Sequence, residues 1–210
     1  MERPVSSEAA CPFCRPGLDR LALLASKHYV VIPDEYPRCT GHLLLVTRTH
    51  LIDHMDAPNT WMHDLEATQT RMRRFLLETF GRYSFLENGG HRKEVPHAHL
   101  HGVPVELSID PVRLEGHVHQ VESWDDLQRR AAGADRYAYV ETSRARYFVP
   151  DDQYWPILNM IRSQTVAQTD GQFEGDWLAR FGPQVVARTR ALWAAWEKRT
   201  PKSCSGSSYR

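Results

Sequence analysis

The stretch His97-Ala98-His99-Leu100-His101 places three histidines at alternate positions of the chain. On a β-strand, alternate side chains point to the same face and lie about 7 Å apart, so the three imidazoles would form a row while Ala98 and Leu100 point into the core. Val103 and Val105 continue the apolar pattern and predict that the strand runs on to residue 105. Such a row suits two chemistries, which are transition-metal binding by neutral imidazoles and attack on phosphorus by a histidine nucleophile.

The composition favours one globular core with an appendage and excludes several other classes of protein. The chain has 210 residues, 26 basic and 26 acidic side chains, and 41% hydrophobic residues. Balanced charge argues against a dedicated nucleic-acid or membrane-surface protein. The sequence lacks a run of about 18 apolar residues and an apolar signal-peptide region near its start, so we expect a cytoplasmic location.

A second motif, Cys11-Pro12-Phe13-Cys14, precedes the histidine row by more than 80 residues. A redox-active CxxC pair normally follows a strand and opens a helix in a βαβ unit, and this sequence predicts no such unit around it. As half of a zinc site, the pair would need two further ligands from elsewhere in the chain.

The segment from His97 to Pro104, HAHLHGVP, resembles the signature of the histidine triad (HIT) superfamily, in which three histidines alternate with apolar residues. The resemblance implies that the middle residue, His99, is a nucleophile and that His101 contacts phosphate oxygens. Transferase branches of the superfamily typically carry glutamine at the third position. His101 therefore favours hydrolysis.

The resemblance extends to the branch of the superfamily that carries a CxxC pair and binds zinc. In that branch the other two ligands are the first histidine of the triad and a histidine that ends a Gly-His-strand segment. Residues 41–50, GHLLLVTRTH, match that segment. The resemblance thus implies one structural Zn²⁺ per chain, held by Cys11, Cys14, His50 and His97. The alternative for His50 is a structural or phosphate-proximal histidine, as in members without CxxC.

The same resemblance assigns candidate substrate contacts. Asp34 follows the predicted strand at residues 28–32, where the family binds the ribose, and a carboxylate can accept both ribose hydroxyl protons. Glu87 and Asn88 stand where the family lines the phosphate site, with an ordinary turn as the alternative. Glu94 occupies the region in which many hydrolases of the family place a serine that contacts the leaving group, so the leaving group stays open.

We expect an α+β fold with an antiparallel sheet of about five strands and one long helix over residues 60–80, where apolar residues recur at helical spacing. Residues 11–110 are predicted to form the HIT-like core, residues 111–199 a C-terminal α/β extension packed on it, and residues 1–10 and 200–210 flexible tails. Within the extension, strands are expected at 137–141 and 146–149 and helices at 154–169 and 183–198.

The expected function is hydrolysis at the α-phosphate of a nucleoside phosphoramidate or related nucleotidyl compound, through a nucleotidyl-histidine intermediate. Four alternatives stay open: dinucleoside polyphosphate hydrolysis, nucleotidyl transfer, a metal-dependent enzyme that uses the triad as ligands, and a non-catalytic nucleotide binder. The expected partner is a small nucleotide, with no nucleic-acid polymer and no membrane. A homodimer is expected only because the family is commonly dimeric.

Overall fold

The computed structural model describes residues 11–109, 118–169 and 177–200. Most of both expected tails and the proposed boundary at residue 110 lie outside this description, so the division into core and extension stays a prediction. Thr200, expected in the C-terminal tail, is instead buried, and its N–H donates to the carbonyl of Trp196.

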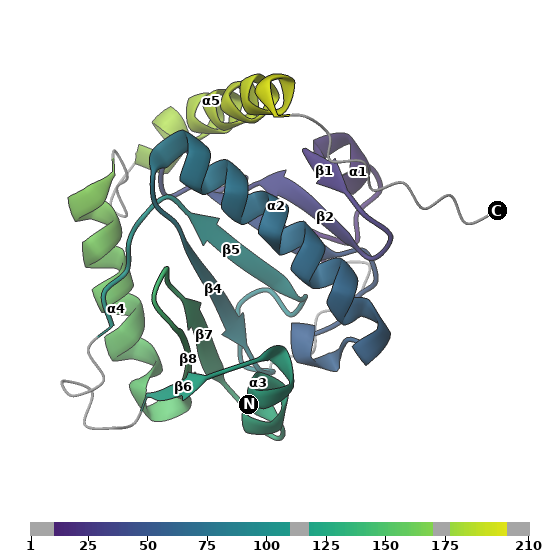
Figure 1. Ribbon diagram of the computed structural model, residues 1–210, viewed down its shortest axis with the longest axis vertical. Coiled ribbons are helices and arrows are strands. Elements are labelled where there is room, and N and C mark those ends of the chain that lie inside the picture. Colours follow the sequence, from purple (N-terminus) through teal and green to yellow (C-terminus); the bar gives the residue numbers. More distant parts are fainter. Residues whose placement is uncertain (1–10, 110–117, 170–176, 201–210) are drawn as a thin grey trace.

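One antiparallel sheet runs through the molecule, with strands in the order β1-β2-β3-β5-β4-β7-β8-β6 (Figure 1). The expected five-stranded core comprises β1 (Leu24–Ala25), β2 (Tyr29–Pro33), β3 (Leu43–Thr47), β4 (Ser84–Gly89) and β5 (His99–Val103). The extension adds β7 (Tyr137–Glu141), β8 (Arg146–Pro150) and β6 (His119–Val121) to the β4 edge. The α+β class is therefore confirmed, and the sheet has eight strands because the extension continues the core sheet.

The long helix α2 (Met62–Phe80) covers one face of this sheet. Its buried side chains include Leu65, Met72 and Phe75, which recur at helical spacing and pack against the inward residues of β2, β3 and β5. Gly81 ends the helix with a φ of 74°, a left-handed conformation that glycine adopts without steric strain. The helix expected from the apolar period is thus confirmed.

The strand that carries the histidines, β5, lies between β3 and β4 near the middle of the sheet. His101 pairs with Leu44 of β3 and with Leu86 of β4, while Leu100 points to the α2 face. The strand begins at His99, so the expectation of a strand from His97 to residue 105 was too long at both ends. The rings of His99 and His101 have centroids 5.0 Å apart, closer than the expected 7 Å.

Glu87 and Asn88 lie within a strand and do not form the ordinary turn that was the alternative for them. Strand β4 continues to Gly89, because Asn88 pairs with Ala138 and Gly89 with Tyr137 of β7. A Cβ on Gly89 would lie 2.0 Å from the Tyr137 ring, so the missing side chain makes room for that ring. Only Gly90, with a φ of 85°, turns the chain.

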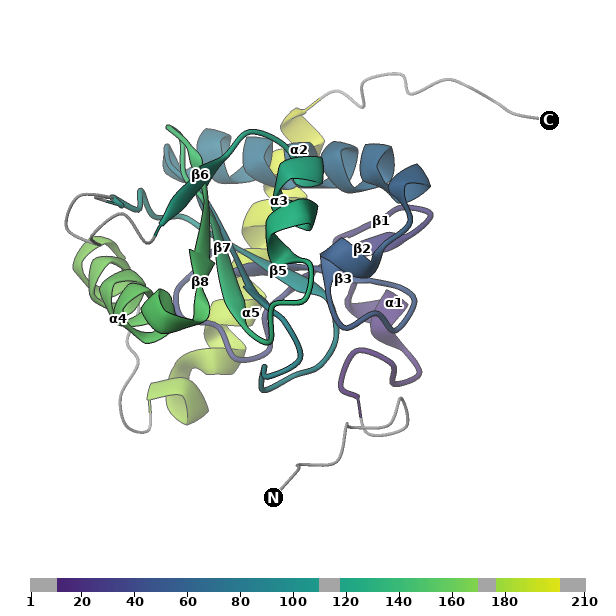
Figure 2. The same cartoon turned by 90° about the horizontal axis from the view of Figure 1, so that it is seen from below.

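One long helix of the extension packs on the face of the sheet opposite α2, and the other packs on α2 itself. Helix α4 (Asp151–Gln168) lies on the face of the sheet opposite α2 (Figure 2). Its buried side chains Ile157 and Ile161 pack against residues of β7 and β8. Helix α5 (Trp177–Arg199) places Trp193 and Trp196 against Phe75 of α2. Helices α1 (Leu18–Leu21) and α3 (Trp124–Ala131) are shorter, and two 3₁₀ turns span His54–Asp56 and Asn59–Trp61. None of the helices within the described ranges has the length and apolar character needed to cross a bilayer.

Candidate active site and metal centre

The three histidines of the row have different surroundings. His97 turns toward the N-terminal cysteines, His101 toward β2 and β3, and His99 lies between them. His97 is fully buried, and His99 is 7% exposed.

Four potential metal ligands meet at one end of the row. The Sγ of Cys11 lies 3.3 Å from Nδ1 of His97, and the Sγ of Cys14 lies 3.1 Å from Nδ1 of His50. All four ligand atoms of Cys11, Cys14, His50 and His97 are within 4.8 Å of one another. Two thiols and two imidazoles are a donor set that tetrahedral structural zinc prefers, so these residues fit a Zn²⁺ ion.

The orientation of His97 supports that fit. Its Nε2 lies 2.8 Å from the carbonyl oxygen of Thr47, which can only accept, so Nε2 carries the proton and Nδ1 faces the sulfurs with a free lone pair. Metal-bound histidines are commonly oriented by such a hydrogen bond from the other ring nitrogen. Burial lowers the pKa of His97 to about 4, which keeps the ring neutral and able to bind a cation.

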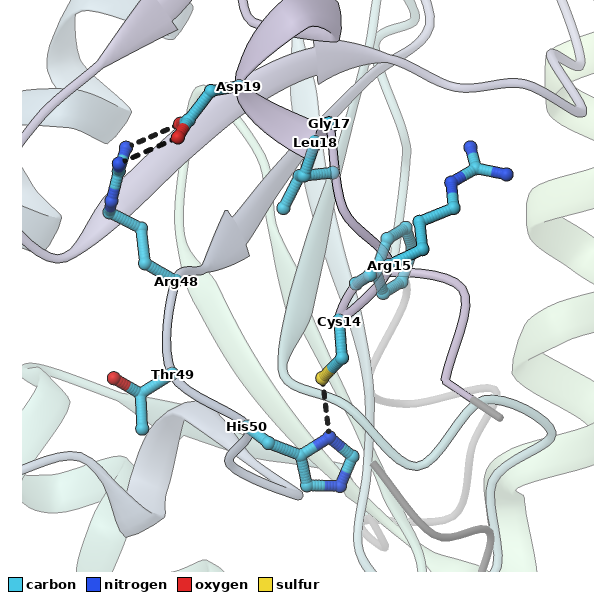
Figure 3. A pocket seen from close by; sticks show the side chains of 9 residues that line it. Cys14, Arg15, Gly17, Leu18, Asp19, Arg48, Thr49 and His50 are labelled. Carbon is cyan, nitrogen blue, oxygen red and sulfur yellow. Dashed lines mark hydrogen bonds and ion pairs between the residues drawn. The ribbon is translucent and has the colours of Figure 1, made fainter. Parts of the chain in front are cut away.

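A cavity of about 350 Å³ opens beside this cluster and is lined by residues that include Cys14, His50, Arg48 and Asp19 (Figure 3). An ion pair of 2.8 Å joins Arg48 to Asp19 across it. The lining includes neither His99 nor His101, so this cavity is separate from the remaining histidine pair. It provides a route by which an ion could reach Cys14 and His50.

His99 is held in one tautomer. Its Nδ1 lies 2.6 Å from the carbonyl oxygen of His97, so Nδ1 carries the proton and Nε2 keeps its lone pair. The ring of Phe13, from the CxxC loop, packs at 5.3 Å between centroids. Burial, aided by the charge of His101 when that ring is protonated, lowers the pKa of His99 well below its ordinary value. The ring is therefore neutral at physiological pH and has one nitrogen available for attack.

His101 has a second histidine, His42, as its neighbour within hydrogen-bond distance. The backbone N–H of Arg38 donates to Nδ1 of His42, so a neutral His42 carries its proton on Nε2. That nitrogen lies 3.0 Å from Nδ1 of His101 and 3.3 Å from Oδ2 of Asp34. Burial lowers the pKa of His101 to about 4 and also lowers that of His42, so both rings are neutral. When His42 donates to His101, the proton of His101 is on Nε2 and can donate to a ligand.

Asp34, His42 and His101 form the second group of potential metal ligands among the described residues. Each group contains one member of the triad, and His99 belongs to neither. The metal-dependent alternative requires that the three histidines converge on one ion. In this structure they do not.

The two candidate substrate-binding residues on β4, Glu87 and Asn88, point to opposite faces of the sheet. Asn88 lies on the same face of the sheet as His99, by the alternation that pairs Leu86 with His101. Glu87 faces α2, is fully buried, and accepts bonds of 3.2 and 2.7 Å from the backbone N–H and Nδ1 of His54. The structure thus does not bring Glu87 to the histidine row, which corrects the expectation, because successive strand residues point to opposite faces.

Three residues of the site had no predicted role: Phe13, His42 and Thr47. His42, Leu44 and Val46 are alternate residues, so their side chains point to the same face of the sheet as those of His99 and His101, which pair with Val46 and Leu44. This alternation was the signal that could have placed His42 beside His101. Phe13 and Thr47 had no signal of their own, because their contacts depend on how the N-terminal loop and β3 meet.

Comparisons with family models, with curated proteins and with solved structures gave the following matches. The model of the HIT domain matches residues 17–106, which include the histidine row and exclude the CxxC pair and the extension. No curated protein matches the chain in sequence.

Several solved structures are similar at low identity. A Zn-bound histidine triad family protein from Mycobacterium smegmatis has 24% identity and a TM-score of 0.40, over 60% of this chain and 96% of that one. A hypothetical histidine triad nucleotide-binding protein from Sulfolobus tokodaii has 14% identity and a TM-score of 0.46, over 93% and 100%. The Plasmodium falciparum diadenosine triphosphate hydrolase has 18% identity and a TM-score of 0.38, over 53% and 71%. The match of the domain model thus covers the part of the chain that carries the histidine row, and residues 17–106 are similar to the HIT domain.

Proposed function

We propose that this protein is a nucleotide hydrolase that cleaves at an α-phosphate through a nucleotidyl group on His99. The observation that carries the proposal is the 2.6 Å hydrogen bond from Nδ1 of His99 to the carbonyl of His97. It leaves Nε2 as an unprotonated nitrogen on a neutral ring, which is the state that a nucleophilic histidine needs.

In the first step, Nε2 of His99 forms a bond to the α-phosphorus and the bond from phosphorus to the leaving group breaks, with its electron pair going to the leaving group. In the second step, water attacks phosphorus, the P–N bond breaks, and the nucleoside monophosphate leaves with the proton balance restored through solvent. Nε2–H of His101 donates to a phosphate oxygen in both steps, because the contact from His42 holds that tautomer.

The remaining side chains bind and position the substrate in this proposal. Asp34 accepts hydrogen bonds from the ribose hydroxyls, and Asn88 contacts the phosphate from β4. Cys11, Cys14, His50 and His97 hold a Zn²⁺ ion, which when bound would lock the N-terminal loop to β5. The histidine at the third position, His101, supports water rather than an alcohol as the acceptor of the nucleotidyl group. The cytoplasmic location and the homodimer stay predictions from the sequence.

Replacing the nucleophile tests the proposal. His99→Asn should bind an adenosine nucleotide and retain its metal but lose turnover of an adenosine phosphoramidate or polyphosphate by several orders of magnitude, as nucleophile removal does in other enzymes. His101→Ala should lose about 10²–10³-fold, the usual effect of removing one oxyanion donor. His119→Asn, which removes an exposed histidine on β6, is the matched control.

Wild-type protein that is denatured without acid during turnover should carry a nucleotidyl group on His99, detected by mass spectrometry of the peptides. Near-normal turnover by His99→Asn would refute the proposal. A product in which an added alcohol or phosphate takes the nucleotide in preference to water would instead indicate a transferase.

A further inference from the structure

Helix α5 carries a threonine within an otherwise apolar buried stripe. The buried side chains of this stripe recur at three- and four-residue spacing: Val185, Thr189, Trp193 and Trp196. A buried threonine inside a helix usually satisfies its hydroxyl by donating to a carbonyl one turn earlier. Thr165 of α4 does so, because its Oγ1 donates to the carbonyl of Ile161 at 2.8 Å. Thr189, which is 1% exposed, differs because its Oγ1 accepts a hydrogen bond from a segment outside its helix.

The partner of Thr189 is the turn that leads into β3. The backbone N–H of Gly41 donates to Oγ1 of Thr189 at 2.9 Å, and this bond is buried. Gly41 has a φ of 91°, and a Cβ there would lie 2.7 Å from the ring of Phe80, so the turn is pressed against the end of α2. A buried N–H needs an acceptor, and α5 supplies one from a residue that is 148 positions away in the chain.

The residue that follows Gly41 is His42, the neighbour of His101. The N–H of His42 donates to the carbonyl of Cys39 at 3.2 Å, and the N–H of Arg38 donates to Nδ1 of the His42 ring at 3.1 Å. The backbone of residues 38–42 therefore determines where this ring lies. A shift of the turn would move Nε2 of His42 relative to Nδ1 of His101, which is 3.0 Å away, and hydrogen bonds weaken steeply when their geometry is disturbed.

Helix α5 is itself anchored, so Thr189 has a defined position. Trp193, one turn after Thr189, packs on Phe75 of α2 with 4.8 Å between ring centroids. Nε1 of Trp196 donates to the carboxylate of Glu78, also on α2, at 2.7 Å. An acceptor on an anchored helix can hold the turn in place rather than move with it.

From these contacts, and resting on the proposed function, we propose that Thr189 is a positioning residue for His42 and, through it, for His101. By accepting the N–H of Gly41, its hydroxyl fixes the turn that carries His42. The ring of His42 in turn orients the ring that donates to the phosphate. The C-terminal helix then completes the proposed active site, although it lies outside the residues that are similar to the HIT domain.

The test replaces the acceptor without changing the shape of the side chain. Thr189→Val should lower kcat about tenfold for the adenosine phosphoramidate or polyphosphate that wild type turns over faster, because His101 is displaced rather than removed. Thr189→Ser, which keeps the hydroxyl, should recover most of the loss. Thr165→Val is the matched control, since it removes a hydroxyl from a threonine of the extension that is 2% exposed, and it should leave kcat unchanged. All values are measured below the unfolding transition of each variant.

A double-mutant cycle decides whether the effect passes through His101. In the His101→Ala background, Thr189→Val should cause no further loss of kcat, because residues that act through one another are not additive. An equal loss in both backgrounds would show general damage to the fold and overturn the inference. An unchanged kcat in Thr189→Val, or the same loss in Thr165→Val, would overturn it as well.

NMR of the imidazole nitrogens in the ligand-free protein separates this inference from the proposed function. Thr189→Val should shift the ring-nitrogen signals of His42 and His101 and leave those of His119 in place, whereas Thr165→Val should shift none of them. If these signals move while wild type carries no nucleotidyl group on His99, the proposed function fails and the positioning of the pair stands. If His99 does carry the group and the signals do not move, the inference fails and the proposed function stands.

Discussion

Each histidine of the row has one ring nitrogen committed to a neighbour within the protein. Nε2 of His97 donates to Thr47, Nδ1 of His99 donates to the carbonyl of His97, and Nδ1 of His101 faces His42. The same side chain is therefore suited to three different tasks, because the three rings differ in their hydrogen-bond partners: a carbonyl at Nε2 of His97, a carbonyl at Nδ1 of His99, and a second imidazole at Nδ1 of His101. Sequence spacing cannot encode this, because it depends on which partner the fold brings to each ring.

The low pKa of His101 predicts how stability depends on pH. Its pKa is about 4 in the folded protein, against an ordinary value of 6.5, because the ring is buried beside His42. Between these two values the unfolded chain binds more protons, so this contribution to stability is full above pH 6.5 and is lost as the pH falls toward 4. The loss amounts to about 1.4 kcal/mol per pH unit.

Urea unfolding at several pH values between 4 and 7 measures this slope. In His101→Gln the curve should be shallower than in wild type by about 1.4 kcal/mol per pH unit. Both proteins keep the cysteine–histidine cluster, so its own titration cancels in the difference. His119→Gln controls for the loss of a histidine as such, and equal slopes in wild type and His101→Gln would contradict the prediction.

At the scale of elements, the junction of β4 with β7 decides how the extension joins the core. Tyr137 stands over Gly89, and its hydroxyl donates to Oδ1 of Asp53 at 2.5 Å. The other carboxylate oxygen of Asp53 accepts the N–H of Gly90 at 2.8 Å. The ring is thereby held from both ends and cannot move aside for a larger residue.

Gly89→Ala should therefore destabilise the protein by about 3 kcal/mol, the upper part of the range for overpacking a closed core. Gly102→Ala is the matched control, since it adds the same methyl to the neighbouring strand. Its closest neighbour is the terminal methyl of Met72, at 2.3 Å, and a flexible methionine can move away. We expect a loss of no more than about 1 kcal/mol there. Unfolding midpoints in urea would show the difference, and an equal or larger loss for Gly102→Ala would contradict this account.

At the scale of the whole molecule, segments distant in sequence close around the sheet. The cysteine–histidine cluster joins the N-terminal loop to the end of β3 and the start of β5. At the other end of the chain, Trp193 and Trp196 are 1% exposed and pack on α2. The core between these contacts is large enough to fold without the metal, so the ion should add stability rather than decide whether the chain folds.

The purified protein should contain one zinc ion per chain, and Cys14→Ser should contain almost none. The folded state of wild type should be more stable by about 4 kcal/mol when zinc is present at 1,000 times its Kd, because the ion binds the folded chain preferentially. Metal analysis and thermal unfolding with and without a chelator measure both quantities. Cys204→Ser, which removes a cysteine that is not among the four proposed ligands, is the control.

Two zinc ions per wild-type chain, with one retained in Cys14→Ser, would contradict this prediction. That result would indicate metal binding by Asp34, His42 and His101. A metal-free wild type with unchanged stability would exclude the zinc site altogether.

Several features followed from local pattern in the sequence. The apolar period predicted α2, the alternation of histidine with apolar residues predicted β5, and strands were expected at residues 137–141 and 146–149, where β7 and β8 lie. The resemblance to the zinc-binding branch of the family implied that Cys11, Cys14, His50 and His97 form one cluster, and these four residues do lie together. These features depend on interactions whose period or spacing is written in the order of residues along the chain.

Other features depended on contacts between segments that the sequence does not relate. Glu87 faces α2 rather than the histidine row, because the pairing of β4 with β5 decides which alternate residues of β4 point to each face of the sheet. Asn88 and Gly89 lie in a strand because β7, some 50 residues later, supplies the partner. The pairing of His42 with His101 is likewise decided by tertiary packing, since a side chain acquires its hydrogen-bond partner only from the atoms that the fold brings around it.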